Sequence, residues 1–383
     1  MVQYTDSQIP NQKIMILIKK IYKKEIPAFF NDSSFWKHDF LSISKHRLYA
    51  HYKNPSADDD DVILLLAYMN EELVGYMGVF IDKIVLDNVE SKIGWLSTWW
   101  VHPKTKGTGV GREILNTMYE VQNKKIGISQ FTPSAKRVYD KSGYFVDLKQ
   151  NIGIKAVLRS NLIFVIPTLY PKLKSFNPLW NLIDNTLNIF VDIKLNIQKS
   201  SIQSRLKNVK LEYVNYIDDE ILSIITTHSK NHISPKKANF FEWMKAYHWV
   251  QEAPLLGNVD RKKYEFSSYD KHFNIYLIKI IEKNECLGFV VLQKRNYVLK
   301  VLFSYYDEKY SQLITDIVVL QSIHQNVREI ICYDEIISKE MNKSSVFLYK
   351  TKKIKQSIIS KSFNKERFDD VIVNFGDGDC SFA

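Results

Sequence analysis

The residues best suited to chemistry lie in a short glycine-rich stretch, Lys106-Gly-Thr-Gly-Val-Gly-Arg112. The chain has only 13 glycines, and three of them stand at positions 107, 109 and 111. Glycine weakens helices and strands, so such a cluster marks backbone that something must approach closely. An aromatic strand precedes the stretch and an apolar helical pattern, Arg112 to Val121, follows it. Free N–H groups at a helix start, with the positive end of the helix dipole, predict a phosphate site.

A second motif lies downstream and consists of Ser134-Ala135, Tyr139 and Gly143-Tyr144-Phe145, in a stretch that indicates a short helix closed by Gly143. With the glycine stretch, it makes the segment from about Val62 to Phe145 resemble the GCN5-related N-acetyltransferases, the GNAT superfamily. The family's first motif is Arg or Gln, two residues, Gly, one residue, then Gly or Ala. Here both glycines are present and Lys106 stands in the Arg or Gln position. Two motifs in the right order are far more specific than a lone pair of glycines.

The resemblance implies an acetyl-CoA or other acyl-CoA cofactor, held by the glycine loop, the end of the preceding strand and the start of the later helix. The residues expected to contact it are Trp99, Trp100, Val101, Lys106, Gly107, Thr108, Gly109, Val110, Gly111, Arg112, Ser134 and Tyr139.

Acetyl transfer to an amine needs a polarised thioester, an unprotonated amine and a proton for the leaving thiolate. Tyr139 matches the family tyrosine that supplies this proton, although its spacing also fits a core tyrosine. Glu90 and His102 are candidate bases, and His102 fits a structural role in the loop as well. A water held by Thr98 or Ser97 would serve in place of a side-chain base.

Acceptor binding is expected before the central motif and at the end of the chain. Arg47 and Asn54 stand where family members build the acceptor wall, and Asp377 and Asp379 suit sugar hydroxyls or an amine. The same residues also fit a surface arginine and a tight turn. Trp243 and Trp249 suit either sugar stacking or a core.

The surrounding pattern predicts an α/β protein with a mixed sheet. Residues 62–70 and 73–81 indicate a hairpin, residues 94–101 a third strand, and residues 14–26 an amphipathic helix. A similar order recurs from residue 276 to 325, without a glycine loop. We therefore expect a GNAT catalytic domain over 1–150, a basic amphipathic linker over 151–208 and a degenerate GNAT-like domain over 209–383.

Charge and composition limit the possible partners. The net charge is +11, and residues 151–210 alone carry nine basic and two acidic side chains. Because the excess positive charge is confined to one segment, the sequence argues against a nucleic-acid-binding surface. Two interpretations of residues 155–205 remain, an interdomain helix or a basic surface for peripheral membrane contact. Three scattered cysteines and the absence of metal-ligand spacing indicate a reducing compartment and no metal, so a cytoplasmic enzyme is expected, at most at the inner face of the membrane.

The sequence thus predicts an acyl-CoA-dependent N-acetyltransferase. Its two-domain form resembles enzymes of bacterial surface-polysaccharide synthesis, which implies a small-molecule amine acceptor, a nucleotide-linked amino sugar. The alternatives are a transferase that uses aminoacyl-tRNA or a longer acyl-CoA, and a non-catalytic binding module.

Overall fold

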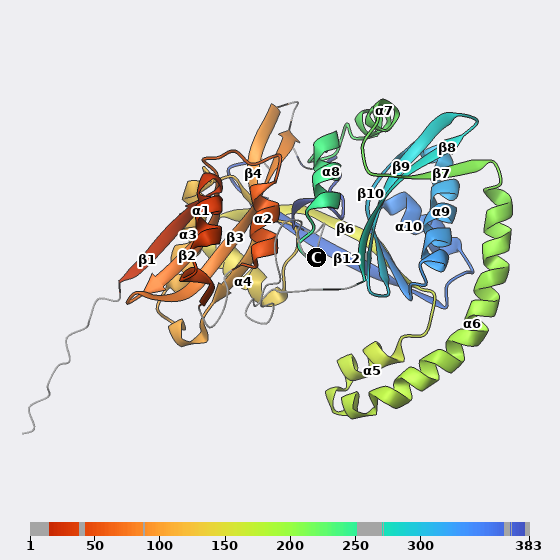
Figure 1. The fold of residues 1–383 in the computed structure, drawn as a ribbon, viewed down its shortest axis with the longest axis horizontal. Coiled ribbons are helices and arrows are strands. Elements are labelled where there is room, and N and C mark those ends of the chain that lie inside the picture. Colours follow the sequence, from red (N-terminus) through yellow and green to blue (C-terminus); the bar gives the residue numbers. More distant parts are fainter. Residues whose placement is uncertain are drawn as a thin grey trace, which may run out of the picture.

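A computed structural model of the chain describes residues 15–37, 43–86, 89–250, 270, 272–363, 368 and 370–379. In this part of the chain one twelve-stranded mixed sheet runs through the whole molecule (Figure 1). Its strand order is β1-β2-β3-β4-β5-β12-β6-β11-β10-β9-β8-β7. The mixed α/β class expected from the sequence is confirmed.

The first half supplies six strands and four helices. Their bounds are β1 Ile16–Tyr22, α1 Ile26–Asn31, α2 Lys45–Tyr52, β2 Val62–Met69, β3 Glu72–Leu86, β4 Val89–Val101, α3 Val110–Val121, β5 Ile126–Ile128, α4 Pro133–Ser142 and β6 Phe145–Val157.

An arm follows, and then a second half with the same order of elements. The arm comprises α5 Leu162–Leu169, the 3-10 helix η4 Pro171–Phe176 and α6 Asn177–Arg205. The second half comprises β7 Val209–Val214, α7 Asp219–His228, α8 Ala238–Ala246, β8 Phe273–Glu282, β9 Glu285–Arg295, β10 Val298–Tyr306, α9 Ser311–His324, β11 Glu329–Cys332, α10 Glu335–Lys343 and β12 Tyr349–Ser360.

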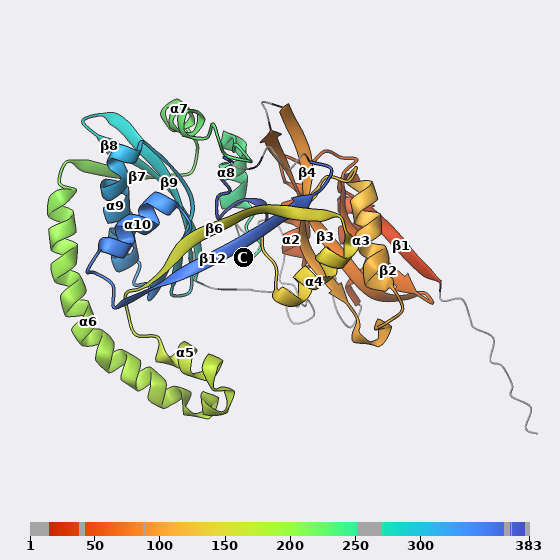
Figure 2. The same ribbon diagram turned by 180° about the vertical axis from the view of Figure 1, so that it is seen from behind.

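The two halves exchange their last strands at the centre of the sheet. β12, from the second half, inserts between β5 and β6 of the first half, and β6 lies between β12 and β11. The antiparallel pair of β6 and β12 runs from Phe145↔Ser360 to Val157↔Tyr349, and both views show it crossing the middle of the molecule (Figure 2). β6 therefore continues through the expected boundary at residue 150.

One predicted element is wrong. Residues 16–22 form the edge strand β1, paired antiparallel with β2, rather than part of a helix over 14–26. Three isoleucines in this stretch, Ile16, Ile18 and Ile21, favour a strand because their branched side chains are stiff at χ1. The open edge of β2 then supplies the backbone hydrogen bonds.

Three apolar clusters hold the sheet. One surrounds α3 in the first half, and another lies under α6, α9 and α10 in the second. The third is shared by both halves, because Phe80 and Trp95 pack in the same cluster as Phe241, Phe303 and Phe375. The halves are therefore joined by a common aromatic core as well as by the exchanged strands. No helix among the described residues is long and apolar enough to cross a bilayer.

Candidate functional site

The two central strands of the first half diverge and leave a gap between them. β4 pairs with β5 in parallel only at Gly94↔Ile126 and Trp95↔Gly127. Beyond this point β4 continues to Val101 while β5 ends at Ile128. A bulge at Ser97 bends β4 at the same place, since Gly78 faces Thr98 and Val79 faces Leu96. Residues 97–101 therefore turn one backbone edge toward the gap.

The glycine loop lies at the end of this free edge. Gly107 and Gly109 have φ of +85° and +87°, and an added Cβ would meet no atom within 4 Å at either residue. Both glycines are therefore required by backbone conformation and face open space. Gly111 is different, because a Cβ there would lie 3.4 Å from the Trp99 ring.

Some N–H groups of the loop are used within it. The N–H of Lys106 donates to Pro103 and that of Thr108 donates to Thr105, at 3.2 and 3.0 Å. Helix α3 begins at Val110, and the first turn of a helix has no intrahelical acceptors for its N–H groups. The anion-binding capacity thus belongs to the residues that open α3, Val110, Gly111 and Arg112, with Gly109 as N-cap.

These features fit a coenzyme A thioester. The start of α3 and the open loop suit a pyrophosphate, and the free edge of β4 over Trp99, Trp100 and Val101 suits an extended amide-containing arm. Such a thioester supplies an activated acyl group when bound. Ser134 lies in the first turn of α4.

Tyr139 borders the gap from α4. Its ring packs against Trp99, Phe131 and Phe145, with centroids 5.6, 6.4 and 5.4 Å apart. Burial, and secondarily the nearby Asp379 carboxylate, raises the pKa of Tyr139. The phenol therefore keeps its proton at neutral pH.

The C-terminal segment meets α2 and the residue that follows β5, close to Tyr139. Ser129 Oγ donates to Asp379 Oδ1 at 2.9 Å, and Arg47 lies 3.8 Å from Asp379 Oδ2. Arg47 also donates to Ser97 and its guanidinium lies 4.5 Å from the centre of the Trp249 ring. Burial raises the pKa of Asp379, and Arg47 opposes that rise. The Asp379 carboxylate is half-buried and accepts hydrogen bonds from the hydroxyls of Ser129 and Ser97. Such a carboxylate can hold an ammonium group or accept a proton from it.

Asp377 lies two residues earlier but in a different setting. It is fully buried, accepts from the N–H of Asn374 at 2.7 Å and lies 3.6 Å from Lys236. Lys236 in turn lies 2.6 Å from Asp82 of β3. Asp377 therefore belongs to a buried charge cluster between the halves, which we call the Asp82–Lys236–Asp377 cluster.

Other expected site residues are not brought into the gap. Glu90 lies exposed at the far end of β4 and pairs with Lys83 at 2.8 Å, which lowers its pKa. Asn54 is buried and donates to Ile81 O at 2.8 Å. Thr98 is buried with its hydroxyl beside Gly78, and that hydroxyl has no hydrogen-bond partner among the described residues. His102 Nδ1 accepts from the N–H of Lys104 at 3.1 Å, which is the structural role.

The two tryptophans of the second half are also engaged within the protein. Trp243 is buried in the shared core and donates to Ala50 O at 2.9 Å. The Trp249 ring stacks on His51, 5.7 Å away, in addition to its contact with Arg47.

The matching junction of the second half has no phosphate cradle. β10 leads through the 3-10 helix η6, Glu308–Tyr310, into α9, and the sequence has no glycine between Gly288 and Gly376. Asp307 caps this turn by accepting from the N–H of Lys309. A cavity of about 1290 Å³ lies alongside, between β6, β10 and α10. Its lining mixes polar and apolar side chains and lacks the backbone geometry of the glycine loop.

Comparison with known proteins agrees with this geometry. Residues 18–146 match the family model described as an acetyltransferase (GNAT) domain. The matched segment covers about a third of the chain. It contains the glycine loop, the gap and Tyr139, and GNAT domains bind acyl-CoA. The enzyme class expected from the sequence, an acetyltransferase, is therefore confirmed.

Solved structures are similar to this chain over most of its length. A conserved protein of Enterococcus faecalis, described as a probable N-acyltransferase, has a TM-score of 0.50 at 10% identity, with 90% of this chain and 72% of that chain covered. A GCN5-related N-acetyltransferase from Kribbella flavida has a TM-score of 0.46 at 10% identity, with 91% and 71% covered. N-myristoyltransferase of Saccharomyces cerevisiae, solved with bound myristoyl-CoA, has a TM-score of 0.46 at 7% identity, with 90% and 82% covered. No curated protein matches the sequence.

The glycine loop provides a direct test of the cofactor site. Gly109→Ala is expected to weaken acetyl-CoA binding at least 10-fold in titration calorimetry, because a side chain at positive φ strains the N-cap and intrudes on the anion site. Gly143→Ala is the matched control, since Gly143 also has positive φ (+73°) and no atom within 4 Å of an added Cβ, but it closes the far end of α4. Equal losses of affinity in both variants would contradict a cofactor role for the loop.

Proposed function

We propose that this protein transfers an acyl group from an acyl-CoA, acetyl-CoA in the first instance, to the amino group of a sugar. The observation that carries the proposal is the gap between β4 and β5. The glycine loop and Tyr139 border it, and so does the Asp379 carboxylate, which is held by Ser97, Ser129 and Arg47.

In this proposal each residue around the gap has a separate role in the reaction. Asp379 holds the acceptor ammonium and takes its proton, and the amine attacks the thioester carbonyl. N–H groups on the free edge of β4 stabilise the charge that develops on the carbonyl oxygen. Tyr139 protonates the departing thiolate, and its raised pKa means that the proton is present at neutral pH. Arg47 positions Asp379 and Ser97 by contacting both.

An amino sugar is the acceptor class that these side chains favour. Ser97, Ser129 and Asp379 place hydroxyl and carboxylate oxygens beside each other at the mouth of the gap, as needed for an amine flanked by hydroxyls. A nucleotide-linked amino sugar for a bacterial surface polysaccharide, modified in the cytoplasm, fits this class. The second half supplies Trp249 to this wall, so it takes part in forming the acceptor side.

The test is turnover by the purified full chain with acetyl-CoA and a panel of nucleotide-linked amino sugars. Free thiol and the mass of the acylated product are followed together. The matched acceptors are the same sugars with a hydroxyl in place of the amine, and they should give no product. Absence of any coenzyme A binding would refute the acyltransferase proposal, whereas binding without turnover of any amino sugar would refute only the acceptor.

Parallel reactions decide between the donors. Longer acyl-CoAs test whether the gap takes an extended chain, and aminoacyl-tRNA tests the peptidyl-transferase alternative. Turnover with aminoacyl-tRNA alone would replace the present proposal.

Tyr139→Phe separates the proposed acid role from packing. Phenylalanine keeps the contacts with Trp99, Phe131 and Phe145, so the fold and coenzyme A affinity should persist. Loss of the phenol proton is expected to lower kcat about 10- to 100-fold with KM nearly unchanged. An unchanged kcat in steady-state kinetics would show that the thiolate takes its proton from elsewhere.

A further inference from the structure

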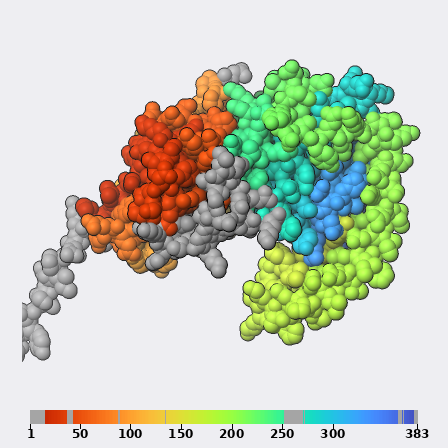
Figure 3. Space-filling view, viewed as in Figure 1, coloured from red at the N-terminus to blue at the C-terminus, as the bar shows by residue number. Residues whose placement is uncertain are grey.

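The arm formed by α5, η4 and α6 extends away from the sheet. In Figures 1 and 2 it leaves the body after β6, turns, and returns along the outside of the second half. The space-filling view shows it as a projecting ridge at the edge of the molecule (Figure 3). Its C-terminal part packs on α9, whereas α5 packs on α6 itself.

Helix α6 faces the body with few residues. The buried positions of α6 are Asp184, Leu195 and Ile202, which fall on one side of a helix with 100° per residue. Leu195 and Ile202 join the core under α9, and Asp184 accepts from the N–H groups of α5. These contacts define the inner face of α6.

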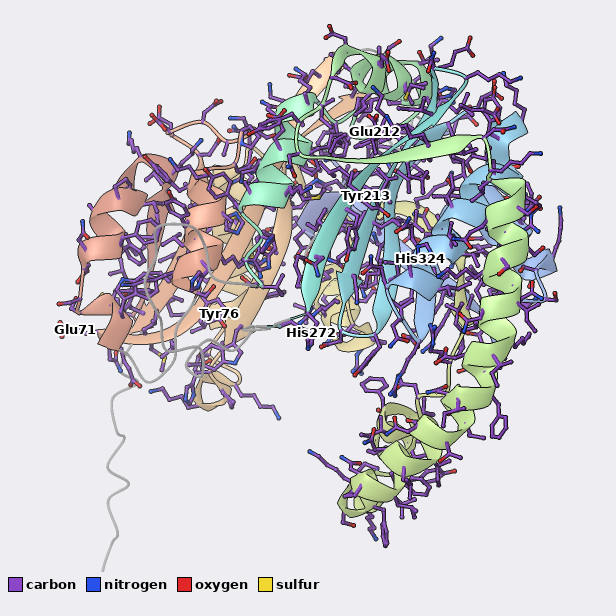
Figure 4. All side chains as sticks on the ribbon, turned by 45° about the vertical axis from the view of Figure 1, so that its right-hand side comes forward. Glu71, Tyr76, Glu212, Tyr213, His272 and His324 are labelled. Carbon is purple, nitrogen blue, oxygen red and sulfur yellow. The ribbon has the colours of Figure 1, made fainter. Side chains whose placement is uncertain are left out.

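The opposite face is apolar and exposed. Leu182, Ile189, Ile193 and Ile197 leave 63, 62, 57 and 67% of their surface accessible. Together with Leu179 and Phe190 they fall within a sector of about 100° opposite the buried side. The stripe from Leu179 to Ile197 is about 27 Å long at 1.5 Å per residue. Figure 4 shows side chains projecting from the arm on the side away from the sheet.

The tip of the arm also exposes apolar side chains, and it carries two lysines in addition. Phe164, Leu169, Tyr170 and Phe176 are all more than half exposed, at 62, 64, 60 and 52%. The exposed Lys172 and Lys174 lie in η4 between them. Aromatic rings beside lysines, whose long stems reach toward water, are typical of a membrane interface.

The charge of the arm indicates which kind of partner binds this surface. Residues 151–210 carry nine basic and two acidic side chains, and each of the two acids is paired with an arginine. Asp184 is fully buried and lies 3.2 Å from Arg328, and Asp192 pairs with Arg159 at 2.7 Å. The surface is therefore apolar and positive. A second copy of the arm would bring like charges together, whereas an anionic bilayer offers both an apolar phase and the opposite charge.

We propose that the outer face of α6 and the tip of the arm dock in the headgroup region of an anionic lipid bilayer. The apolar stripe lies along the membrane plane, and Lys172 and Lys174 contact the phosphates. The sheet and the gap between β4 and β5 remain in water. This proposal does not rest on the acyl-transfer activity.

Flotation of the full-length protein with vesicles tests the docking. Wild type should float with phosphatidylcholine vesicles that contain 30% phosphatidylglycerol, and much less with phosphatidylcholine alone. The triple variant Leu182→Ser, Ile189→Ser, Ile193→Ser should reduce the partition coefficient roughly 100-fold, because three apolar side chains no longer enter the lipid. The variant Lys172→Glu, Lys174→Glu should abolish the preference for anionic vesicles.

A matched control removes three exposed apolar residues outside the arm, Leu17→Ser, Val89→Ser and Leu222→Ser, which are 61, 60 and 40% exposed in the wild type. This control should float like the wild type, and all variants should unfold at the wild-type urea midpoint. The proposal is overturned if wild type fails to float, or if the α6 triple variant floats like the control. Light scattering that shows a dimer dissociated by the α6 triple variant, without vesicle binding, would assign the face to a second copy instead.

Discussion

Asp379→Asn is expected to lower kcat/KM about 100- to 1000-fold, the range for loss of a positioned general base. Asparagine keeps an oxygen for the hydrogen bonds from Ser129 and Ser97, so the local structure should persist. It cannot bind an ammonium by charge or take its proton. Steady-state kinetics with the preferred amino-sugar acceptor measure the loss, and coenzyme A affinity should not change.

Asp377→Asn is the matched control for this prediction. Both residues are aspartates of the C-terminal segment, but Asp377 is fully buried and faces Asn374 and Lys236 rather than the gap. Its replacement should leave kcat/KM within a few-fold of wild type. If Asp379→Asn also stays within that range, the carboxylate is not the base and the amine reaches the gap already neutral.

Much of the first half could be predicted from local sequence. The glycine loop is a local signal because Gly107 and Gly109 have to adopt positive φ where the chain turns into α3. The β2–β3 hairpin is also local, with Asn70 and Glu71 at positive φ in its turn, and the matching turn of the second half has Lys283 and Asn284 in the same conformation. The positions of β2, β3, β4, α3 and α4 followed from such signals, whereas β1 did not.

The acceptor side of the site depends on contacts that no local pattern encodes. Asp379 meets Ser129 across 250 residues, and the Asp82–Lys236–Asp377 cluster joins three distant segments. The exchange of β6 and β12 has the same origin, since either strand could have paired within its own half. The sequence marked Asp379 as a candidate by type, but neither Ser129 nor Lys236 carried a local signal.

Lys236→Met is expected to lower the free energy of unfolding by about 3–5 kcal/mol, the usual loss when one partner of a buried ion pair is removed. Lys236 Nζ lies 2.6 Å from Asp82 Oδ2 and 2.7 Å from Ser234 Oγ. Both charged side chains of the pair are nearly inaccessible, at 2 and 3% exposed. Without the ammonium, two carboxylates would remain buried near each other. Urea unfolding at pH 7.5 measures the loss.

Lys24→Met is the control, because Lys24 lies at the same 2.6 Å from Asp60 but both side chains are exposed, at 56 and 84%. Solvent screening should make this replacement undetectable in the same urea experiment. Equal losses in the two variants would mean that burial does not govern the Lys236 contact.

The pH dependence of the Lys236→Met loss follows from Asp377. Burial raises the pKa of Asp377 to about 6, above its usual 3.8, and Lys236 opposes that rise. The folded protein therefore binds this proton more tightly than the unfolded chain, so its contribution to stability is complete below pH 4 and is lost as pH rises to about 6. In Lys236→Met the ionised carboxylate has lost its nearest cation, so the destabilisation should be larger at pH 7.5 than at pH 5. A loss that is equal at the two pH values would show that Asp377 and Lys236 are not electrostatically coupled.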